Sequence, residues 1–343
     1  MKKLSAVIFV LGFLTVLNVM GQAPSTPGIS KTVTVYTSLE ESFANEIFQR
    51  FEKETGIKVH YVRLATGECT ARMEAEKSNP QAGIWVGGVG LGHIDAKNKG
   101  LTTPYVSPNA ASIPQQFKDK DHYWTGMYVG MLCFESNTKL LKKFNLTAPA
   151  SWVELCDPKY KGHVQMANPG SSGTSYNALV TLVQIFGEDK AFEMLKKLDA
   201  NINQYTKSGL APGKNASMGE TTIAIGYSHD AVRFINEGYP LTITFPSEGT
   251  GFEVASVSLI KGGPEKEVSA AKKLYDFMLS DTCAEIFAQG KLVPFHSKAK
   301  LAEGAIPVSQ VKVINQDDEW GAKQKQRLIE KWNAVIGGET KTK

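Results

Sequence analysis

Hydroxyl-bearing residues and glycines gather at three places where a strand-like run passes directly into a predicted helix. Thr37 and Ser38 follow one such run, Thr66 and Gly67 stand before a second helix, and the segment 171–175 opens a third. The first N–H groups of a helix lack partners within the helix, and the helix dipole adds positive charge there. These turns are therefore suited to hold an anion, which glycine lets approach the backbone closely.

The same residues also suit helix capping, in which a side-chain oxygen accepts a hydrogen bond from its own helix. Ser38 precedes a helix that is predicted to stop at Gly56, and capping explains Ser38 when it is considered alone. The stretch 168–176 has two glycines and four serine or threonine hydroxyls, more donors than one helix start requires. Anion binding is the favoured interpretation there. The residues assigned to the anion are Thr37, Ser38, Thr66, Gly67, Ser171, Ser172, Gly173, Thr174 and Ser175, with Lys207 as a fixed positive charge.

A further polar group, Ser228-His229-Asp230, follows the strand predicted over 223–227. Three adjacent residues cannot form a nucleophile, base and orienting acid in line, because neighbouring side chains point in different directions. No Gly-x-Ser-x-Gly motif occurs in the sequence. As hydrogen-bonding groups at the carboxyl end of a strand, Ser228, His229 and Asp230 are expected to hold hydroxyl groups of a polar ligand. A helix cap beside a surface histidine is the alternative for this segment.

The elements that must position these residues alternate between strands and helices, which predicts an α/β fold. Such alternation builds doubly wound sheets whose loops meet at the carboxyl ends of the strands. The run Gly88-x-Gly90-x-Gly92 lacks the dinucleotide-binding spacing and follows the third strand, not the first. The strands that open this pattern are predicted over 32–36, 57–63 and 84–86, with helices following over 39–55, 68–77 and 91–99.

Two domains are expected, because the mature chain is too long for one compact core. The run 126–134 predicts a crossing into the second domain, and the run 253–259 predicts the return. The predicted first lobe comprises 31–124 and 255–300, the second comprises 125–254, and a helical segment over 301–343 packs on both. Crossings near 124–134 and 241–259 are expected to act as the hinge.

Residues 1–23 have the parts of a signal peptide, with Lys2 and Lys3, an apolar run over 6–20 and small residues before a cut after Ala23. No cysteine lies near that cut, so a lipoprotein anchor is not expected, and the mature protein is predicted to be exported to the periplasm. Loss of the two lysines reduces Lys and Arg from 38 to 36 against 34 Asp and Glu, a net charge of +2. This balance argues against a nucleic-acid surface, and a monomer is expected.

The four cysteines, Cys69, Cys133, Cys156 and Cys283, could form two disulfides in an oxidising compartment. Cys133 and Cys156 are the favoured pair, since one ends a predicted strand and the other follows the next helix. Four buried free thiols are an open alternative. No Cys-x-x-Cys pair and no histidine pair at metal-binding spacing occurs, so neither a metal nor a cofactor is expected.

Five segments together resemble the substrate-binding proteins of bacterial ABC importers, in the extracellular solute-binding group that includes ferric-iron, phosphonate and sugar-phosphate binders. The resemblance implies a two-lobed type II periplasmic-binding-protein fold of the Venus-flytrap kind, in which the ligand lies between the lobes. It also implies a binding role without catalysis, and a membrane permease with its ATPase as partners. The segments are 35–38, 81–88, 157–162, 173–177 and 226–230.

The ligand favoured at this point is a phosphorylated small molecule, with hexose phosphate first. Helix starts rich in hydroxyls suit the phosphate, while His229, Asp230 and Glu253 suit sugar hydroxyls. Ferric iron is the alternative, with Tyr227, His229 and Glu253 as ligands, although the adjacent tyrosines typical of iron binders in this family are absent. Phosphonates, thiamine-like molecules and polyamines also stay open. A secreted phosphatase or hydrolase would need a metal cluster or an oriented nucleophile, which the sequence does not show.

Overall fold

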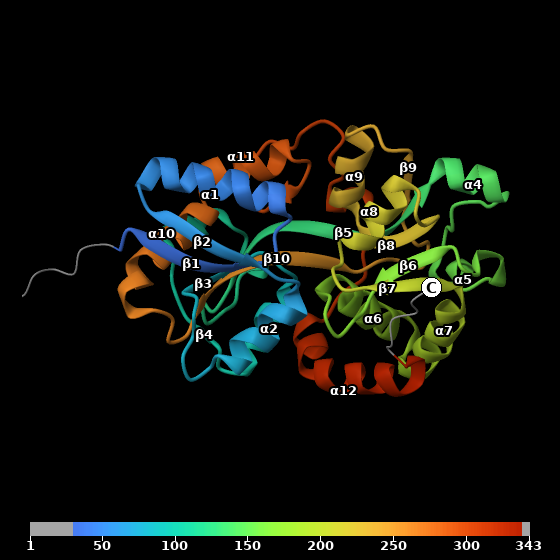
Figure 1. The fold of residues 1–343 in the computed structure, drawn as a ribbon, viewed down its shortest axis with the longest axis horizontal. Helices are drawn as coiled ribbons and strands as arrows, with labels where there is room; N and C mark the ends of the chain where they lie inside the picture. Colours follow the sequence, from blue (N-terminus) through green and yellow to red (C-terminus); the bar gives the residue numbers. More distant parts are fainter. Residues whose placement is uncertain (1–29, 338–343) are drawn as a thin grey trace, which may run out of the picture.

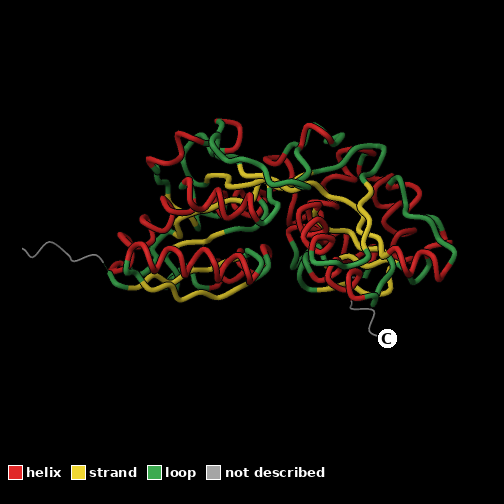
Figure 2. Tube along the Cα trace, turned by 90° about the horizontal axis from the view of Figure 1, so that it is seen from above, coloured by secondary structure: helices red, strands yellow, loops and turns green. Residues whose placement is uncertain are grey.

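The computed structural model describes residues 30–337, so the predicted signal peptide lies outside the described residues. The chain forms two α/β lobes that lie side by side and are joined by the strands β5 (Thr125–Asn137) and β10 (Phe252–Ile260) (Figure 1). Figure 2 shows the same two lobes from above, with strands and loops running from one to the other. This is the two-lobed arrangement that the resemblance implied.

The first lobe is built on parallel strands. The helix after each strand carries the chain back to the end of the sheet where that strand began, so the next strand runs in the same direction. β1 lies between β2 and β3, and β10 continues the sheet in the antiparallel direction beside β3. The apolar face predicted for the first helix is buried, from Phe43 to Phe51. The elements are β1 (Thr32–Thr37), α1 (Glu41–Thr55), β2 (Lys58–Arg63), α2 (Thr66–Ala75), β3 (Ile84–Val86), α3 (Gly90–Asn98), β4 (Thr102–Thr103), α10 (Val268–Met278) and α11 (Asp281–Gln289).

The second lobe contains a mixed sheet. β6 pairs in parallel with β7 and β8, whereas β8 and β9 run antiparallel to β5. The central strand β8 is buried along its whole length and is almost entirely apolar, as expected for a strand covered on both faces. The elements are α4 (Thr138–Phe144), α5 (Trp152–Leu155), β6 (Val164–Ala167), α6 (Gly173–Phe186), α7 (Glu188–Asn201), β7 (Ile202–Thr206), α8 (Ala211–Met218), β8 (Ile223–Tyr227), α9 (Ser228–Asn236) and β9 (Leu241–Thr244).

β5 belongs to both lobes, and the strand order β2-β1-β3-β10-β5-β8-β6-β7 therefore continues through the whole molecule. Its residues 125–131 pair with β10, and its residues 132–137 pair with β8 and β9. The first predicted crossing coincides with β5. Of the second predicted hinge segment, 241–259, only the part from residue 252 onward belongs to β10, because 241–244 form β9 within the second lobe.

The C-terminal part of the chain contacts both lobes. β11 (Val293–Pro294) pairs with β5, and α12 (Asp318–Ile336) packs against α3 of the first lobe and against α6 and α7 of the second. Figure 1 shows α12 running along the lower side of the molecule. Short 3-10 helices complete the described elements: η1 (Pro108–Ser112), η2 (Gln115–Phe117), η3 (Pro158–Tyr160), η4 (Glu265–Glu267) and η5 (Val308–Gln310).

The favoured Cys133–Cys156 disulfide is wrong, because all four cysteines are free thiols. Cys133 is fully buried on β5, whereas the Cys156 thiol lies 3.4 Å from the Trp152 carbonyl and 3.5 Å from the Met194 carbonyl. The alternative of free thiols holds. Among residues 30–337, no helix combines the length and the apolar content that a membrane crossing requires.

Candidate functional site

A cavity of about 70 Å³ lies between the lobes. Strands of both lobes point their carboxyl ends at it: Ser38 follows β1, Arg63 ends β2, Ser208 follows β7 and Tyr227 ends β8. This is where ligands bind in doubly wound sheets. The lining residues are Ser38, Glu40, Phe43, Arg63, Ala65, Thr66, Gly88, Val89, Tyr128, Ser172, Gly173, Thr174, Ser208, Gly209, Leu210, Tyr227, His229, Asp230, Glu253 and Leu292.

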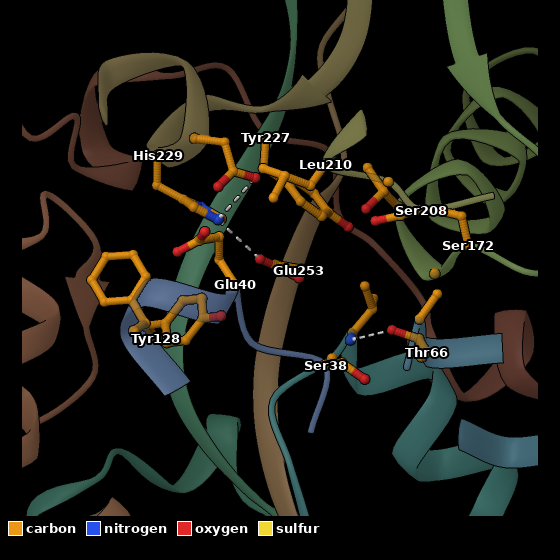
Figure 3. Close-up of a pocket in the computed structure, with 18 of the residues that line it drawn as sticks. Ser38, Glu40, Thr66, Tyr128, Ser172, Ser208, Leu210, Tyr227, His229 and Glu253 are labelled. Carbon is orange, nitrogen blue, oxygen red and sulfur yellow. Dashed lines mark hydrogen bonds and ion pairs between the residues drawn. The ribbon is translucent and has the colours of Figure 1, made fainter. Parts of the chain in front are cut away.

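The cavity has two chemically different ends (Figure 3). We call one the hydroxyl end and the other the acidic end. In Figure 3, Ser38, Thr66, Ser172 and Ser208 lie to one side, while Glu40, Tyr128 and His229 lie to the other. The hydroxyl end comprises Ser38, Arg63, Thr66, Ser172, Thr174 and Ser208, and the acidic end comprises Glu40, Tyr128, His229, Asp230 and Glu253.

The hydroxyls of the first lobe approach the loop after β3 closely. Gly88 adopts φ +89°, and a Cβ atom there would lie 3.1 Å from Ser38 Oγ and 3.0 Å from Thr66 Oγ1. Glycine therefore allows this loop to approach both hydroxyls. Thr66 opens α2, and its Oγ1 accepts a hydrogen bond from the Val89 N–H over 3.3 Å.

Ser38 does not cap α1, so the simple capping interpretation is wrong. The cap is Glu40, whose carboxylate accepts from the Ser42 N–H over 2.9 Å. The Ser38 N–H instead donates to the Val86 carbonyl, and its Oγ accepts from the Trp85 indole over 3.2 Å. The same Oγ also lies 3.4 Å from the buried Cys69 thiol, so the Ser38 hydroxyl has two partners within the first lobe while it lines the cavity.

Ser172 does cap its helix: its Oγ accepts from the Ser175 N–H over 3.3 Å at the start of α6. Gly173 and Thr174 follow in the first turn and also line the cavity. The first turn of α6 is therefore presented to the cavity with the positive end of its dipole, as the sequence predicted for this segment.

The acidic end centres on His229 of α9. Its Nε2 lies 3.7 Å from an Asp230 oxygen and 3.6 Å from a Glu253 oxygen. Burial raises the pKa of Glu253 well above its usual range, and the negative charge of Asp230 adds to the rise. Burial also lowers the pKa of His229, against the influence of Asp230. At neutral pH, His229 is thus uncharged and Glu253 can donate as well as accept hydrogen bonds.

Two ion pairs join the lobes on opposite sides of the cavity. Arg233 of the second lobe lies 2.7 Å from Glu40 of the first, and Lys207 lies 2.5 Å from Glu68. Burial acts to raise the pKa of Glu40, but the Ser42 hydrogen bonds and the Arg233 charge outweigh it and lower that pKa. The lobes are thus in direct contact around the cavity.

Gly67 brings the lobes together and does not line the cavity. Its N–H donates to the Ser171 carbonyl over 3.0 Å, and a Cβ there would lie 2.7 Å from the same oxygen. The assignment of Gly67 to an anion is therefore corrected, because its N–H is already used across the lobe contact.

Four other predicted residues also lie off the cavity wall. Thr37 is fully buried and donates to the Val86 carbonyl, and the Ser171 hydroxyl donates to the Lys207 carbonyl over 2.8 Å. Ser175 is fully buried on α6, and the exposed Lys207 ammonium is paired with Glu68. The residues that both the sequence and the cavity identify are Ser38, Thr66, Ser172, Gly173, Thr174, Tyr227, His229, Asp230 and Glu253.

Arg63 is the lining cation that sequence reasoning missed. Its Nε donates to the Leu39 carbonyl over 2.8 Å, which fixes the guanidinium beside the cavity. Its charge lowers the pKa of Glu68 as a minor influence, which places it near the start of α2. Its position at the carboxyl end of a predicted strand was the signal that could have found it. Glu40, Gly88, Tyr128 and Ser208 were missed as well.

Comparison with known proteins identifies the family. Residues 93–319 match the family described as bacterial extracellular solute-binding protein. The periplasmic binding protein AfuA from Actinobacillus pleuropneumoniae, solved with exogenous fructose-6-phosphate bound, is 38% identical with a TM-score of 0.86, over 90% of this chain and 99% of that one. The periplasmic binding protein P5PA is 33% identical with a TM-score of 0.85, over 89% of this chain and 99% of that one.

A curated relative from Salmonella typhimurium extends the comparison. This putative 2-aminoethylphosphonate-binding periplasmic protein is 29% identical over 284 residues, which are 79% of this chain and 80% of that protein. The chain therefore belongs to the bacterial extracellular solute-binding proteins, the periplasmic substrate-binding components of ABC importers.

Proposed function

We propose that this protein captures a phosphorylated small molecule, with a hexose phosphate as the first candidate, for delivery to an ABC permease and ATPase. The observation that carries the proposal is the pairing of a hydroxyl end with an acidic end in one cavity between the lobes. A phosphate needs several donors, and a sugar needs acceptors for its hydroxyl protons.

The hydroxyl end supplies the donors for the phosphate. Ser38 and Thr174 contribute hydroxyl groups, Thr174 from the first turn of α6, and Arg63 contributes one positive charge. Charge-assisted hydrogen bonds from such groups are about twice as strong as neutral ones. We assign the phosphate to this end of the cavity.

The acidic end supplies the sugar contacts. Asp230 is a charged acceptor, whereas the raised pKa of Glu253 leaves it a proton to donate. Hydroxyl groups both donate and accept, so a mixed set of this kind fits a polyol. We assign the sugar hydroxyls to Asp230 and Glu253, with His229 between them.

The relatives support a phosphoryl anion as the ligand. One is a protein whose structure contains fructose-6-phosphate, and another is a putative binder of 2-aminoethylphosphonate. Both ligands combine an anionic phosphorus group with a polar second end. The hydroxyl end of the cavity suits the phosphorus group, and the acidic end suits the polar second end.

We further propose that the lobes close around the ligand. The proposed first lobe comprises 31–124 and 255–300, the second comprises 125–254, and the C-terminal segment from residue 301 packs on both, with its predicted end at 338–343 outside the described residues. β5 and β10 serve as the hinge, because a few residues in connecting strands can absorb the change in backbone angles. Small-angle scattering should show compaction on ligand binding, and an unchanged radius at saturation would contradict closure.

Ferric iron is the less favoured ligand. The Tyr227 phenol is buried and accepts a hydrogen bond from Asn177 over 3.0 Å, and burial raises its pKa well above the usual range. Burial therefore opposes a phenolate ligand, and the Asn177 hydrogen bond offsets this only in part. Among residues 30–337, no group of three or more His, Cys, Asp and Glu side chains is arranged to hold a metal ion.

Calorimetry with glucose 6-phosphate, glucose and inorganic phosphate tests the proposal. We expect the ester to bind more tightly than either part alone, because it occupies both ends of the cavity. Failure of every phosphate ester to bind, together with colour and bound iron in protein purified from its own compartment, would replace this proposal with the iron alternative. A Tyr227→Phe variant that retains full binding would exclude iron bound through that phenolate.

A further inference from the structure

Three glycines, Gly88, Gly90 and Gly92, carry the chain from β3 into α3 beside the hydroxyl end of the cavity. Two of them stand where the backbone packs too closely for a side chain. A Cβ atom would lie 3.0 Å from the Thr66 hydroxyl at Gly88 and 3.0 Å from the Trp85 ring at Gly92. The spacing that does not fit dinucleotide binding thus allows this loop to pack tightly against the hydroxyl end.

The peptide groups of Gly87 and Gly88 have one polar atom without a partner. The Gly87 N–H donates to the Ser256 carbonyl of β10 over 2.8 Å, and the Gly88 carbonyl accepts from the Ser256 N–H over 3.2 Å. The Gly87 carbonyl lies 3.0 Å from His93 Nε2. Gly88 is buried, yet its N–H has no hydrogen-bond partner among residues 30–337. Such buried N–H groups are rare in native proteins, so this one indicates a partner outside the chain.

The peptide bond between the two glycines fixes the direction of that N–H. The described chain has no cis peptide bond, and the carbonyl and N–H of a trans peptide point in opposite directions. The Gly87 carbonyl is turned toward His93 of α3, so the Gly88 N–H is turned away from α3. Gly88 lines the cavity, whereas His93 lies fully buried behind it. Figure 3 shows Ser38 and Thr66, the neighbours of Gly88, next to each other at this end.

The surroundings of His93 fix its ring in one tautomer. A carbonyl oxygen can only accept, so Nε2 carries the proton and donates to Gly87. Nδ1 is then the acceptor for the Ser258 hydroxyl of β10, which lies 2.7 Å away. The imidazole also stacks on the Trp85 indole, with the ring centres 3.8 Å apart. Burial lowers the pKa of His93 to about 3, so the ring is neutral at neutral pH.

We propose that His93 is a positioning residue for the phosphate: by binding the Gly87 carbonyl, it presents the Gly88 N–H to the anion at the hydroxyl end. The same imidazole supports the Trp85 indole, which donates to Ser38 Oγ, so two groups that line this end depend on it. Backbone N–H groups in such turns suit oxyanions, and glycine leaves the approach open. This inference rests on the proposed function, since it assumes that a phosphate occupies the hydroxyl end.

NMR of the full mature protein tests the donor directly. Glycine labelled with ¹³C and ¹⁵N gives amide signals that can be filtered for a preceding glycine, which leaves Gly88, Gly263 and Gly338. We expect inorganic phosphate to shift the Gly88 amide proton strongly downfield, because it gains a hydrogen bond to an anion. Sodium chloride at the same ionic strength should not cause this shift. Gly263 is the internal control, since its N–H already donates to the Ile260 carbonyl.

Variants of His93 separate positioning from packing. His93→Phe keeps a ring that can stack on Trp85 but removes the donor to Gly87, so affinities for inorganic phosphate and glucose 6-phosphate should both fall about 10-fold. His93→Gln has an amide N–H that can reach the same carbonyl, and its affinities should stay within about threefold of native. His163→Phe is the matched control, because the His163 ring bonds the Thr222 hydroxyl within the second lobe, off the cavity wall. It should leave both affinities unchanged.

The outcomes separate this inference from the proposed function. If no phosphate ligand binds the native protein, the proposed function fails and this inference fails with it. If phosphate binds without a shift of the Gly88 amide proton, only the inference is overturned. Native affinity in a folded His93→Phe protein would also overturn it, as would equal losses in His93→Phe and His93→Gln at equal stability in urea. Should neither variant fold, an Nδ1–H tautomer of native His93 in long-range ¹⁵N spectra would contradict the assigned bond to Gly87, and the Nε2–H tautomer would support it.

Discussion

The two ends of the cavity are assembled in different ways. At the hydroxyl end, Thr66 and Thr174 stand in the first turns of their own helices, so each donor is adjacent in sequence to the element that supports it. At the acidic end, Glu40, Asp230 and Glu253 come from the first lobe, the second lobe and a connecting strand. Folding alone brings these three carboxylates together.

This difference separates two kinds of recognition. The hydroxyl end uses helix starts, which can hold any phosphoryl group without regard to what it is attached to. Under the proposed function the acidic end contacts the rest of the ligand, because a phosphate at the hydroxyl end places the second end of the molecule there. Substitutions at the first end should therefore affect all phosphoryl ligands, while those at the second should affect only esters.

The largest effect is expected for Arg63→Gln. This change removes the cation that lines the hydroxyl end, so inorganic phosphate and glucose 6-phosphate should both lose about 2–3 kcal/mol of binding free energy. Calorimetry measures both losses. Arg50→Gln is the matched control, because Arg50 lies on α1 with 52% of its side chain exposed and pairs with Glu54. Equal affinities for the Arg63 variant and the native protein would remove Arg63 from the anion site.

Asp230→Asn should separate the two ends most clearly. The amide replaces half of the acceptor capacity with donors, so glucose 6-phosphate should lose about 1.5–3 kcal/mol. Inorganic phosphate, which does not reach the acidic end, should bind with unchanged affinity. Competition of each ligand against one fluorescent phosphate ester gives the ratio of the two affinities directly. Parallel losses for the two ligands would show that the ends are not independent.

Ser38→Ala and Ser172→Ala compare two serines that look alike in the sequence. Ser38→Ala should weaken phosphate binding by about 1–3 kcal/mol. Ser38 caps no helix, but its removal also takes the acceptor from the buried Trp85 indole, so some loss of stability is expected as well. Ser172→Ala removes the cap of α6 and should lower the free energy of unfolding by about 1 kcal/mol. Urea unfolding and calorimetry on the same samples distinguish these outcomes. Unchanged phosphate affinity in the Ser38 variant would remove Ser38 from the anion site.

Lys207→Gln should have the smallest effect. The ammonium is 76% exposed and paired with Glu68, so its removal should weaken ligand binding by about 0.2–1 kcal/mol through the lobe contact. High salt should abolish this difference, because surface ion pairs are screened. A loss as large as that of Arg63→Gln would restore Lys207 as an anion ligand.

Local sequence was sufficient wherever a role depends on neighbours in the chain. The alternation of strands and helices predicted the α/β fold, and the hydroxyl-rich turn at 171–175 predicted the start of α6 at the cavity. His229 and Asp230 were found because they follow a strand that ends at the cavity, whereas Glu253, at the start of β10, was assigned only with the family resemblance in view. Each of these inferences needs only a strand, its direction and the residues next to it.

Tertiary structure decided which candidates face the ligand. Ser38 and Thr37 are adjacent, yet Thr37 is buried with its hydroxyl bonded to the Val86 carbonyl of a different strand, whereas Ser38, although bonded to the Trp85 indole and the Cys69 thiol, lines the cavity. Lys207 and Arg63 are both cations that the sequence offers for an anion. In the folded protein, Lys207 pairs with Glu68 of the other lobe, whereas Arg63 lines the cavity. Cys133 and Cys156 likewise stay apart because β5 buries one of them and α5 holds the other. Such outcomes depend on contacts between residues far apart in the chain, and a hydrogen-bonding group that the fold has already paired is no longer available to a ligand.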